Sequence, residues 1–326
     1  ILITGGTGSF GQKFILHLIK NYSPKKIIVF SRDELKQWQM QKTIESVNKT
    51  VIRYLIGDIR DKERLTMAME GVDIVIHAAA LKQVPTAEYN PFEVIKTNVM
   101  GAQNVIDAAI QNKVKKVIAL STDKAAAPIN LYGATKLTSD KLFIAANNYK
   151  GWNDIKFSVV RYGNVMGSRG SVIPHFIEQK KSGTLTITDN KMTRFNITLI
   201  EGVEFVINSL ERMWGGEIFV PKIPSYRILD LANAIAPEAK LKIINLRPGE
   251  KINEDMITEN DALNTVEFEN HYSILSQSDY ISWNMHDYMK AHKDAKRCKE
   301  NFFYNSGSNK DFLSIEQIKK LITNIT

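Results

Sequence analysis

The chain has 326 residues, of which 44% are hydrophobic and 24% charged, an ordinary balance for a globular protein with a sizeable core. The net charge of +8 is spread along the chain, so a surface that serves anionic small ligands is a better interpretation than a nucleic-acid footprint. No apolar run reaches the roughly 18 residues of a membrane span, no metal-ligand pattern is present, and the single cysteine, Cys298, excludes a disulfide framework and favours a reducing, cytoplasmic location.

A short apolar strand is predicted at residues 1–4, followed at once by a glycine-rich turn and an amphipathic helix. In the turn, Gly5 permits a tight bend, Gly8 lets the backbone approach a pyrophosphate, and Gly11 lets helix and strand pack closely. Strand, glycine turn and helix in this order predict a dinucleotide site at the helix N-terminus. The cofactor contacts expected from this segment are Gly5, Thr7, Gly8, Ser9, Phe10 and Gly11.

The second predicted strand, at residues 26–30, ends beside the position that distinguishes NAD from NADP. An NAD site usually has a carboxylate there for the ribose 2′-hydroxyl. Here Ser31 and Arg32 stand at that position, with Lys36 one helical turn later, and these side chains suit a 2′-phosphate better. We therefore expect NADP rather than NAD; the alternative is that Arg32 is a solvated residue next to Asp33.

Small and polar residues follow the next two predicted strands, at residues 51–56 and 73–77. Asp58 either meets an adenine amino group or caps the following helix. His77 is interpreted as a packed residue at a strand end rather than a catalyst. One long helix is expected over residues 91–111, with two polar side chains facing the site. The further cofactor contacts expected here are Asp58, Ile59, Ala78, Ala79, Ala80, Lys82, Thr97 and Asn98.

Strands at residues 116–120 and 156–160 continue the alternation of strands and helices. This pattern predicts an α/β fold with a doubly wound parallel sheet of the Rossmann type, whose ligands lie at the carboxyl ends of the strands. We divide the chain into an NADP-binding domain, 1–165, and a mainly substrate-binding domain, 166–326, with a strand near 217–220 rejoining the sheet. The second half is less regular, with helices expected at 200–213, 228–235 and 314–322.

The strand at residues 116–120 leads into a cluster of groups that can transfer protons. Tyr132 and Lys136 are spaced to share one face of a helix, and Thr122 precedes them. A neighbouring ammonium and the positive nicotinamide ring favour the phenolate. We therefore expect Tyr132 to take an alcohol proton while hydride leaves the same carbon for the cofactor.

The adjacent Asp123 and Lys124 indicate a second proton transfer, which a simple oxidoreductase or epimerase does not need. Once C4 of a sugar is a ketone, its C5 hydrogen is acidic, and a base there can drive loss of the C6 hydroxyl as water. We expect Lys136 and the nicotinamide charge to lower the pKa of Lys124 so that it acts as this base. Asp123 is expected to protonate the departing hydroxyl; the alternative is an ion pair that caps a strand end.

Seven segments together resemble the extended short-chain dehydrogenase/reductases, and more narrowly the inverting UDP-N-acetylglucosamine 4,6-dehydratases of pseudaminic acid and surface-polysaccharide pathways. They are residues 4–11, 30–36, 77–85, 121–124, 132–136, 161–164 and 247–251, and the likeness extends from residue 1 to about residue 269. Similar dehydratases that retain the C5 configuration carry Thr-Asp-Glu where this chain has Thr122, Asp123 and Lys124. This difference favours the inverting branch.

The resemblance implies an NADP-dependent enzyme, assembled as a homo-oligomer, that converts UDP-N-acetylglucosamine to UDP-2-acetamido-2,6-dideoxy-β-L-arabino-hex-4-ulose. Hydride would move from C4 to C6, so the cofactor is regenerated in each turnover. Asn253 stands where the family usually has histidine, and Ala127 where a polar residue is common. The resemblance places the substrate contacts at Lys82, Asn164, Val172, Arg194, Arg247 and Glu250.

Two alternatives remain open at this point. A UDP-hexosamine 4-epimerase would use the same tyrosine and lysine but leave the C6 hydroxyl in place. A non-catalytic NADP-binding sensor or scaffold would typically lack the pair formed here by Tyr132 and Lys136.

Overall fold

A central sheet organises the protein, which the computed structural model describes over residues 1–45, 51–151, 153–167, 171–278 and 281–323. Within this part of the chain the sheet has ten strands in the order β16-β14-β15-β10-β6-β5-β4-β1-β2-β3. Seven of them are parallel: β1 Leu2–Thr4, β2 Lys26–Ser31, β3 Val51–Ile56, β4 Ile74–His77, β5 Lys116–Leu120, β6 Lys156–Val160 and β10 Ile218–Pro221. The antiparallel strands are β15 His271–Ile274, β14 Thr265–Glu267 and β16 Lys296–Arg297.

The order β3-β2-β1-β4-β5-β6 is that of a dinucleotide-binding sheet, and it confirms the predicted fold class. Strand β10 pairs with β6, with Ile218 opposite Val159, so a strand from the second half of the chain extends the sheet of the first. The strands carry near-continuous apolar runs because both faces of a parallel sheet are covered by helices. In β2, for example, Ile27 to Phe30 are all buried.

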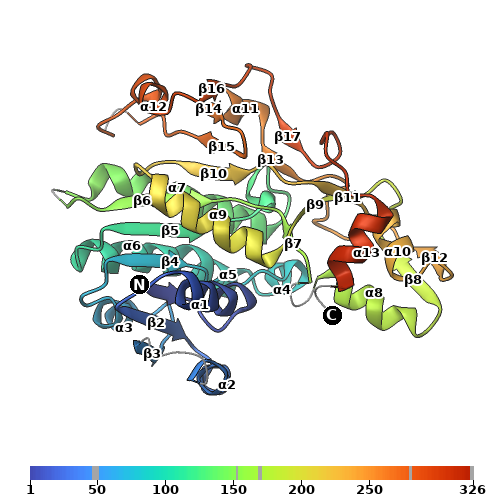
Figure 1. Cartoon of the computed structure of the whole chain (residues 1–326), viewed down its shortest axis with the longest axis horizontal. Coiled ribbons are helices and arrows are strands. Elements are labelled where there is room, and N and C mark those ends of the chain that lie inside the picture. The colour runs from blue at the N-terminus through green and yellow to red at the C-terminus, as the bar shows by residue number, and fades with distance from the viewer. Residues whose placement is uncertain (46–50, 152, 168–170, 279–280, 324–326) are drawn as a thin grey trace.

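Helices cover both faces of the sheet. Figure 1 shows α1 (Ser9–Asn21) and α9 (Leu199–Arg212) in front of it, where they contact each other. Behind it lie α6 (Gly101–Gln111) and α7 (Leu131–Tyr149), with α3 (Lys62–Ala68) packed against α6. The connecting helices are α2 Glu34–Glu45, α4 Val84–Tyr89 and α5 Pro91–Ile95. Ligands bind at the carboxyl ends of the strands in such folds.

The single long helix expected over residues 91–111 is interrupted. After α5, a π-helical turn runs over Lys96–Met100 before α6 begins. The side chain of Asn98, in this turn, donates to the carbonyl oxygen of Leu81 and accepts from its N–H, both at 2.9 Å. The expectation of one regular helix is therefore wrong, because widening this turn lets Asn98 bond to the loop that follows β4.

The second half of the chain builds a smaller lobe with its own apolar core, which includes Phe176, Leu231 and Ile318. Figure 1 places its helices beside the sheet, at the right of the view. Its elements are β7 Asn164–Val165, α8 Val172–Lys180, β8 Thr184–Ile187, β9 Thr193–Ile197, β11 Ser225–Arg227, α10 Ile228–Ile235, β12 Lys240–Ile243 and α13 Ile315–Thr323. The remaining elements are β13 Asp255–Ile257, α11 Glu259–Ala262, α12 Met285–Ala291 and β17 Tyr304–Asn305.

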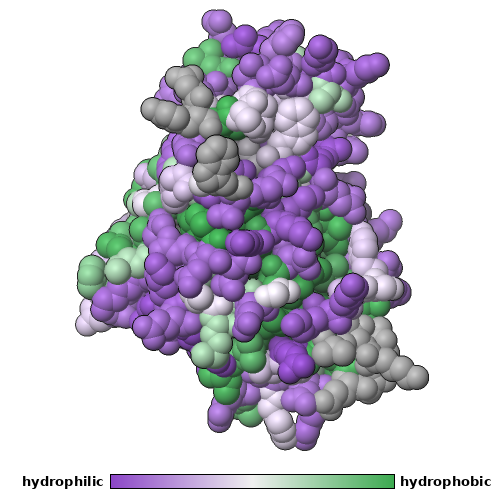
Figure 2. All heavy atoms as spheres, turned by 90° about the vertical axis from the view of Figure 1, so that its left-hand side faces the viewer, coloured by the Kyte–Doolittle hydropathy of each residue, from purple (hydrophilic) through white to green (hydrophobic). Residues whose placement is uncertain are grey.

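Figure 2 shows that the side of the molecule at the left of Figure 1 is mostly hydrophilic, with hydrophobic residues gathered mainly across its middle. Among the residues described, none of the helices combines the length and the apolar character needed to cross a bilayer.

Candidate active site

The glycine turn after β1 lies against the loop that follows β4. Gly5 has a φ of +66°, and a Cβ there would lie 2.9 Å from the Cα atom of Ala79, so the position needs glycine. A Cβ on Gly11 would meet the backbone of Gly6. Helix α1 begins without a side-chain cap, which leaves its first N–H groups available to an anion. The turn thus fits the pyrophosphate of a nicotinamide dinucleotide.

The second part of this cradle is the end of β2. The Arg32 side chain is 54% exposed and its Nη1 lies 3.6 Å from Asp58, whereas Lys36 is paired with Asp33 at 2.6 Å. Asp58 also pairs with Arg60. Because Arg32 is only loosely paired, its guanidinium is the group best able to meet a phosphate at this end of the site.

The structure decides two of the sequence predictions, those for Asp58 and His77. The alternative that Asp58 caps the next helix is wrong, because the cap of α3 is Asp61, whose carboxylate accepts from the N–H of Arg64. His77 is buried and its Nδ1 lies 2.8 Å from the hydroxyl of Thr4. Burial lowers the pKa of His77 to about 3, which fits a packed, neutral imidazole.

The predicted catalytic residues gather where β5 meets α7. A short helical turn, Asp123–Ala125, follows the strand and is capped by Thr122. The hydroxyl of Thr122 donates to Asp123 Oδ1 at 2.8 Å, and the amine of Lys124 lies 3.1 Å from the same oxygen. Helix α7 then brings Tyr132 against this turn, where it interacts with the hydroxyl of Thr122. The structure therefore brings four of the five predicted catalytic side chains into one connected group.

The fifth, Lys136, bonds elsewhere: its Nζ donates to the carbonyl oxygen of Leu120 at 2.6 Å. Burial lowers its pKa. For Tyr132, burial outweighs the neighbouring Lys124 ammonium and raises the pKa to about 12, so the phenol is neutral in this state. The sequence expectation combined a neighbouring ammonium with the positive nicotinamide ring; the ammonium by itself does not lower the pKa of this phenol, and the contribution of the ring stays a prediction.

The pKa expected for Lys124 is also wrong in direction. Burial alone would lower it, but the carboxylates of Asp123 and Glu254 raise the pKa of Lys124 well above its ordinary value. Glu254 lies 3.2 Å from the amine and had not been selected as a site residue. It follows the turn at residues 247–251 in sequence, and only its contact with Lys124 across the fold reveals its place.

The predicted substrate residues lie on several different elements. Asn164 begins β7, and its Oδ1 is buried without a hydrogen-bond partner among the described residues. Val172 begins α8. The guanidinium of Arg194, on β9, donates to three backbone carbonyls, those of Thr193, Lys251 and Ile252.

The turn that contains Arg247 and Glu250 lies against the start of α7. The amide of Asn130 donates to the carbonyl of Gly249 at 2.8 Å, and Lys251 donates to that of Ala126 at 3.0 Å. The Arg247 side chain is half exposed and lies 4.0 Å from Glu250. The turn is thus anchored beside the catalytic cluster while Arg247 stays accessible.

The two positions that depart from the family pattern lie outside the cluster's bonding network. Asn253 accepts from the hydroxyl of Thr193 at 2.7 Å and packs against Gly307. Ala127 is exposed and has a φ of 45°. The asparagine therefore links β9 to the C-terminal segment.

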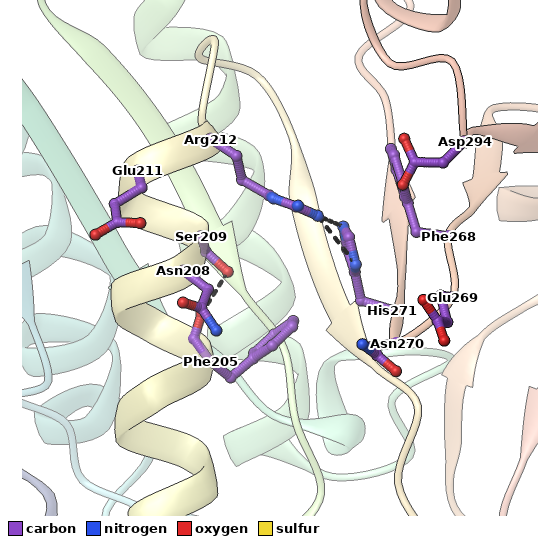
Figure 3. A pocket seen from close by; sticks show the side chains of 10 residues that line it. All are labelled: Phe205, Asn208, Ser209, Glu211, Arg212, Phe268, Glu269, Asn270, His271 and Asp294. Atoms are coloured by element: carbon purple, nitrogen blue, oxygen red, sulfur yellow. Dashed lines mark hydrogen bonds between the residues drawn. The ribbon is translucent and has the colours of Figure 1, made fainter.

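A separate cavity of about 510 Å³ lies between α9 and the β14–β15 hairpin. Figure 3 shows Arg212 reaching across it to His271, to whose Nε2 it donates at 2.8 Å. None of the predicted site residues lines this cavity. It is thus distinct from the candidate active site.

Comparison with known proteins places the chain among enzymes of sugar-nucleotide metabolism. Residues 1–276 match the family described as polysaccharide biosynthesis protein. The chain is 54% identical to a UDP-N-acetylglucosamine 4,6-dehydratase (inverting) of Campylobacter jejuni, over 99% of this chain and 96% of that protein. It is 44% identical to a UDP-glucose 4-epimerase of Rickettsia canadensis, over 84% of this chain and 82% of that one.

A solved structure is also similar over nearly the whole chain. The X-ray structure of Pen from Bacillus thuringiensis superposes with a TM-score of 0.89 at 40% sequence identity, covering 99% of this chain and 96% of that one. The fold described above is therefore that of an existing group of proteins.

Proposed function

Because this chain belongs to the polysaccharide biosynthesis protein family, we propose that it is an inverting UDP-N-acetylglucosamine 4,6-dehydratase. The observation that carries the proposal is the amine of Lys124, held 3.1 Å from Asp123 beside Tyr132. A relative that is 54% identical over nearly the whole chain has this activity in its name. Dehydration needs a base and an acid in addition to the groups that oxidise C4, and this cluster supplies both.

The first step is oxidation at C4 of the sugar. A nicotinamide dinucleotide bound at the glycine turn supplies the hydride acceptor for C4 and the hydride donor for C6. Because Tyr132 is a neutral phenol in the resting site, it must first release its own proton to solvent; the resulting phenolate, oriented by Thr122, then takes the proton of the C4 hydroxyl. Lys136, bonded to the end of β5, contributes a fixed positive charge that favours the phenolate as the proton leaves.

The second step is loss of water across C5 and C6. In the resting site Lys124 is an ammonium and Asp123 a carboxylate, 3.1 Å apart. Transfer of one proton from Lys124 to Asp123 makes a free amine and a carboxylic acid at once. The amine then takes the C5 proton and the acid protonates the departing C6 hydroxyl, which restores the resting charges. This explains why an acid and an amine are adjacent in the same turn.

The preferred cofactor in this proposal is NADP. Its support is Arg32 at the end of β2, half exposed and only loosely paired with Asp58, where an NAD site would have a carboxylate. The uridine diphosphate group is assigned to Asn164, Val172, Arg194, Arg247 and Glu250, of which Arg247 has the most accessible guanidinium.

We also propose that the protein is a homo-oligomer. Its support is a row of exposed large apolar side chains on α4, α5 and the π-helical turn, at Tyr89, Phe92 and Met100. Large exposed apolar patches often mark protein–protein contact sites. Light scattering measures the mass of the assembly, and a monomer at all concentrations would contradict the proposal.

The activity is tested by incubating the protein with NADP and UDP-N-acetylglucosamine in deuterated water. We expect a product that has lost one water and carries deuterium at C5 with inverted configuration, read by mass spectrometry and NMR. A product that keeps its C6 oxygen and differs only at C4 would instead establish a 4-epimerase, the second candidate, whose name several relatives carry. No conversion of either kind would contradict both.

A further inference from the structure

The carboxylate of Glu254 contacts the amine of Lys124, although Glu254 does not belong to the turn that carries Lys124. Glu254 lies just before β13 and is 3% exposed. Its Oε1 lies 3.2 Å from Nζ of Lys124 and 3.8 Å from Nε of Arg194. Its Oε2 is buried and has no hydrogen-bond partner among the described residues. One oxygen is thus engaged with the amine, and the other remains open to a further partner.

The backbone of Glu254 is fixed from both sides. Its N–H donates to the hydroxyl of Ser306 at 2.9 Å, and the N–H of Ser306 donates to its carbonyl oxygen at 2.8 Å. The Ser306 hydroxyl also lies 2.8 Å from that of Thr193. Burying a carboxylate is costly unless it is paired, so an acid held this firmly beside an amine indicates a specific task at that amine.

We propose that Glu254 is a positioning residue for the dehydration step: it holds the amine of Lys124 against Asp123 and stabilises the ammonium that forms during elimination. The inference rests on the proposed function. As the C5–H bond breaks, its proton goes to the Lys124 nitrogen and its electron pair forms the C5–C6 double bond. The C6–O bond breaks as Asp123 gives its proton to the leaving oxygen, so water departs and all charges balance.

The charge on Lys124 therefore changes from neutral to positive in this step. A fixed carboxylate 3.2 Å away stabilises that positive charge as it develops, and it needs no reorganisation to do so. Asp123 alone cannot stabilise the positive charge on Lys124, because Asp123 is neutral until it has given its proton to the leaving oxygen. Glu254 remains charged throughout.

Several charged and titratable groups face Lys124. Asp123, on the same turn, and Glu254 favour its ammonium, whereas Arg194 on β9 disfavours it. Lys82, after β4, also opposes a second positive charge nearby. The phenols of Tyr132 on α7 and Tyr226 on β11 complete the surroundings. Without Glu254, one carboxylate would face two opposing cations, so the amine would lose its proton at lower pH.

The test uses the full-length enzyme with NADP and UDP-2-acetamido-2,6-dideoxyglucose, which lacks the C6 hydroxyl and cannot lose water. After C4 oxidation, exchange of the C5 proton for solvent deuterium reports the basic form of Lys124 and is followed by NMR across pH. For Glu254→Gln we expect the midpoint of this exchange to move about 1 to 3 pH units lower. Glu254→Asp keeps the negative charge, but its shorter side chain places the carboxylate farther from Lys124. It should therefore move the exchange midpoint less, in the same direction.

The matched control is Asp255→Asn, the neighbouring carboxylate, which pairs with Lys251 and Asn305 instead of Lys124. Asp255→Asn should leave the pH midpoint of C5 proton exchange unchanged. A purely structural role for Glu254 would lower exchange at every pH without moving the midpoint, and that result overturns the inference. Should the glutamine variant not fold, the smaller shift to lower pH expected for the aspartate variant decides instead.

Failure of this inference is separable from failure of the proposed function. The parent enzyme must first convert UDP-N-acetylglucosamine to the dehydrated product; if it does not, the proposed function falls and the inference with it. If the parent converts the substrate and the midpoint is the same in the parent and both Glu254 variants, only the role of Glu254 is rejected.

Discussion

The amine of Lys136 donates to the carbonyl oxygen of Leu120 at 2.6 Å and so bonds α7 back to the last residue of β5. The catalytic turn, which runs between these two residues, is thereby closed into a loop with fixed ends. Lys136 is buried, and its position four residues after Tyr132 places both side chains on one face of the helix. The lysine thus holds the geometry of the turn as well as supplying a charge.

Replacing Lys136 with methionine should slow C4 oxidation by at least about 100-fold, because the phenolate loses its supporting charge and the turn loses its closing bond. Stopped-flow absorbance of the reduced cofactor measures this step. The control is Lys141→Met, an exposed lysine on the same helix, which should oxidise at the parent rate. Equal rates in both variants would contradict the role of Lys136.

Replacing Lys124 with alanine should separate oxidation from dehydration. Tyr132 and Lys136 remain, so we expect UDP-N-acetylglucosamine to be oxidised at C4 while water loss and deuterium uptake at C5 stop. Reduced cofactor should therefore accumulate and absorb in the near ultraviolet. The comparison is Tyr132→Phe, which should show neither reduced cofactor nor product. Dehydrated product from the alanine variant at the parent rate would exclude Lys124 as the base.

Replacing Arg32 with alanine should weaken NADP binding by about tenfold or more, since a charge-assisted contact to phosphate contributes about 1.5–3 kcal/mol. NAD binding should change little. Fluorescence titration of cofactor-stripped protein gives both dissociation constants. Arg227→Ala is the matched control, because that side chain, at the end of β11, is similarly exposed, 57% against 54%, and pairs with Asp230 in the first turn of α10. Parallel losses for NAD and NADP would argue against a 2′-phosphate contact.

Stability should fall as the solution is acidified below about pH 6.5, the ordinary pKa of histidine. Burial lowers the pKa of His77 to about 3 in the folded chain, so between these values the unfolded chain binds a proton that the folded chain does not. Each such group costs ~1.4 kcal/mol per pH unit across that window. His271, also lowered to about 3 by burial, acts in the same direction.

Urea unfolding of the parent and of His77→Gln at pH 7 and pH 5 measures this dependence. The glutamine variant is less stable at neutral pH, but its free energy of unfolding should depend less on pH. His175→Gln, at an exposed position on α8, is the control and should keep the parent slope. An unchanged slope in His77→Gln would show that this histidine does not titrate between the two states.

Periodic, local patterns made the fold predictable. The strands expected at residues 116–120 and 156–160 are β5 and β6, and the helices expected at 200–213 and 228–235 are α9 and α10 to within one residue at each end. Apolar runs between glycines and helices specify such elements without reference to the rest of the chain. Between about residue 255 and the helix expected at 314–322, which is α13, no comparable pattern was found, because the short strands there are defined by their partners rather than by their own residues.

The site was predictable to the extent that it lies on one segment. Thr122, Asp123, Lys124 and Tyr132 are close in sequence, and their grouping follows from a strand, a turn and a helix in order. The charge state of Lys124 could not be predicted, because it depends on Glu254, which is distant in sequence and contacts Lys124 only in the folded chain. The π-helical turn that aims Asn98 was missed for the same reason: its cause is a bond to Leu81 in another loop.

The pairing of β10 with β6 also has a consequence for synthesis on the ribosome. Strand β6 ends at Val160, but its neighbour begins only at Ile218, so a growing chain exposes a hydrogen-bonding edge of apolar residues until that later stretch emerges. Chains whose translation pauses or stops between Val160 and Ile218 should therefore be the partial chains most prone to aggregate or to bind chaperones.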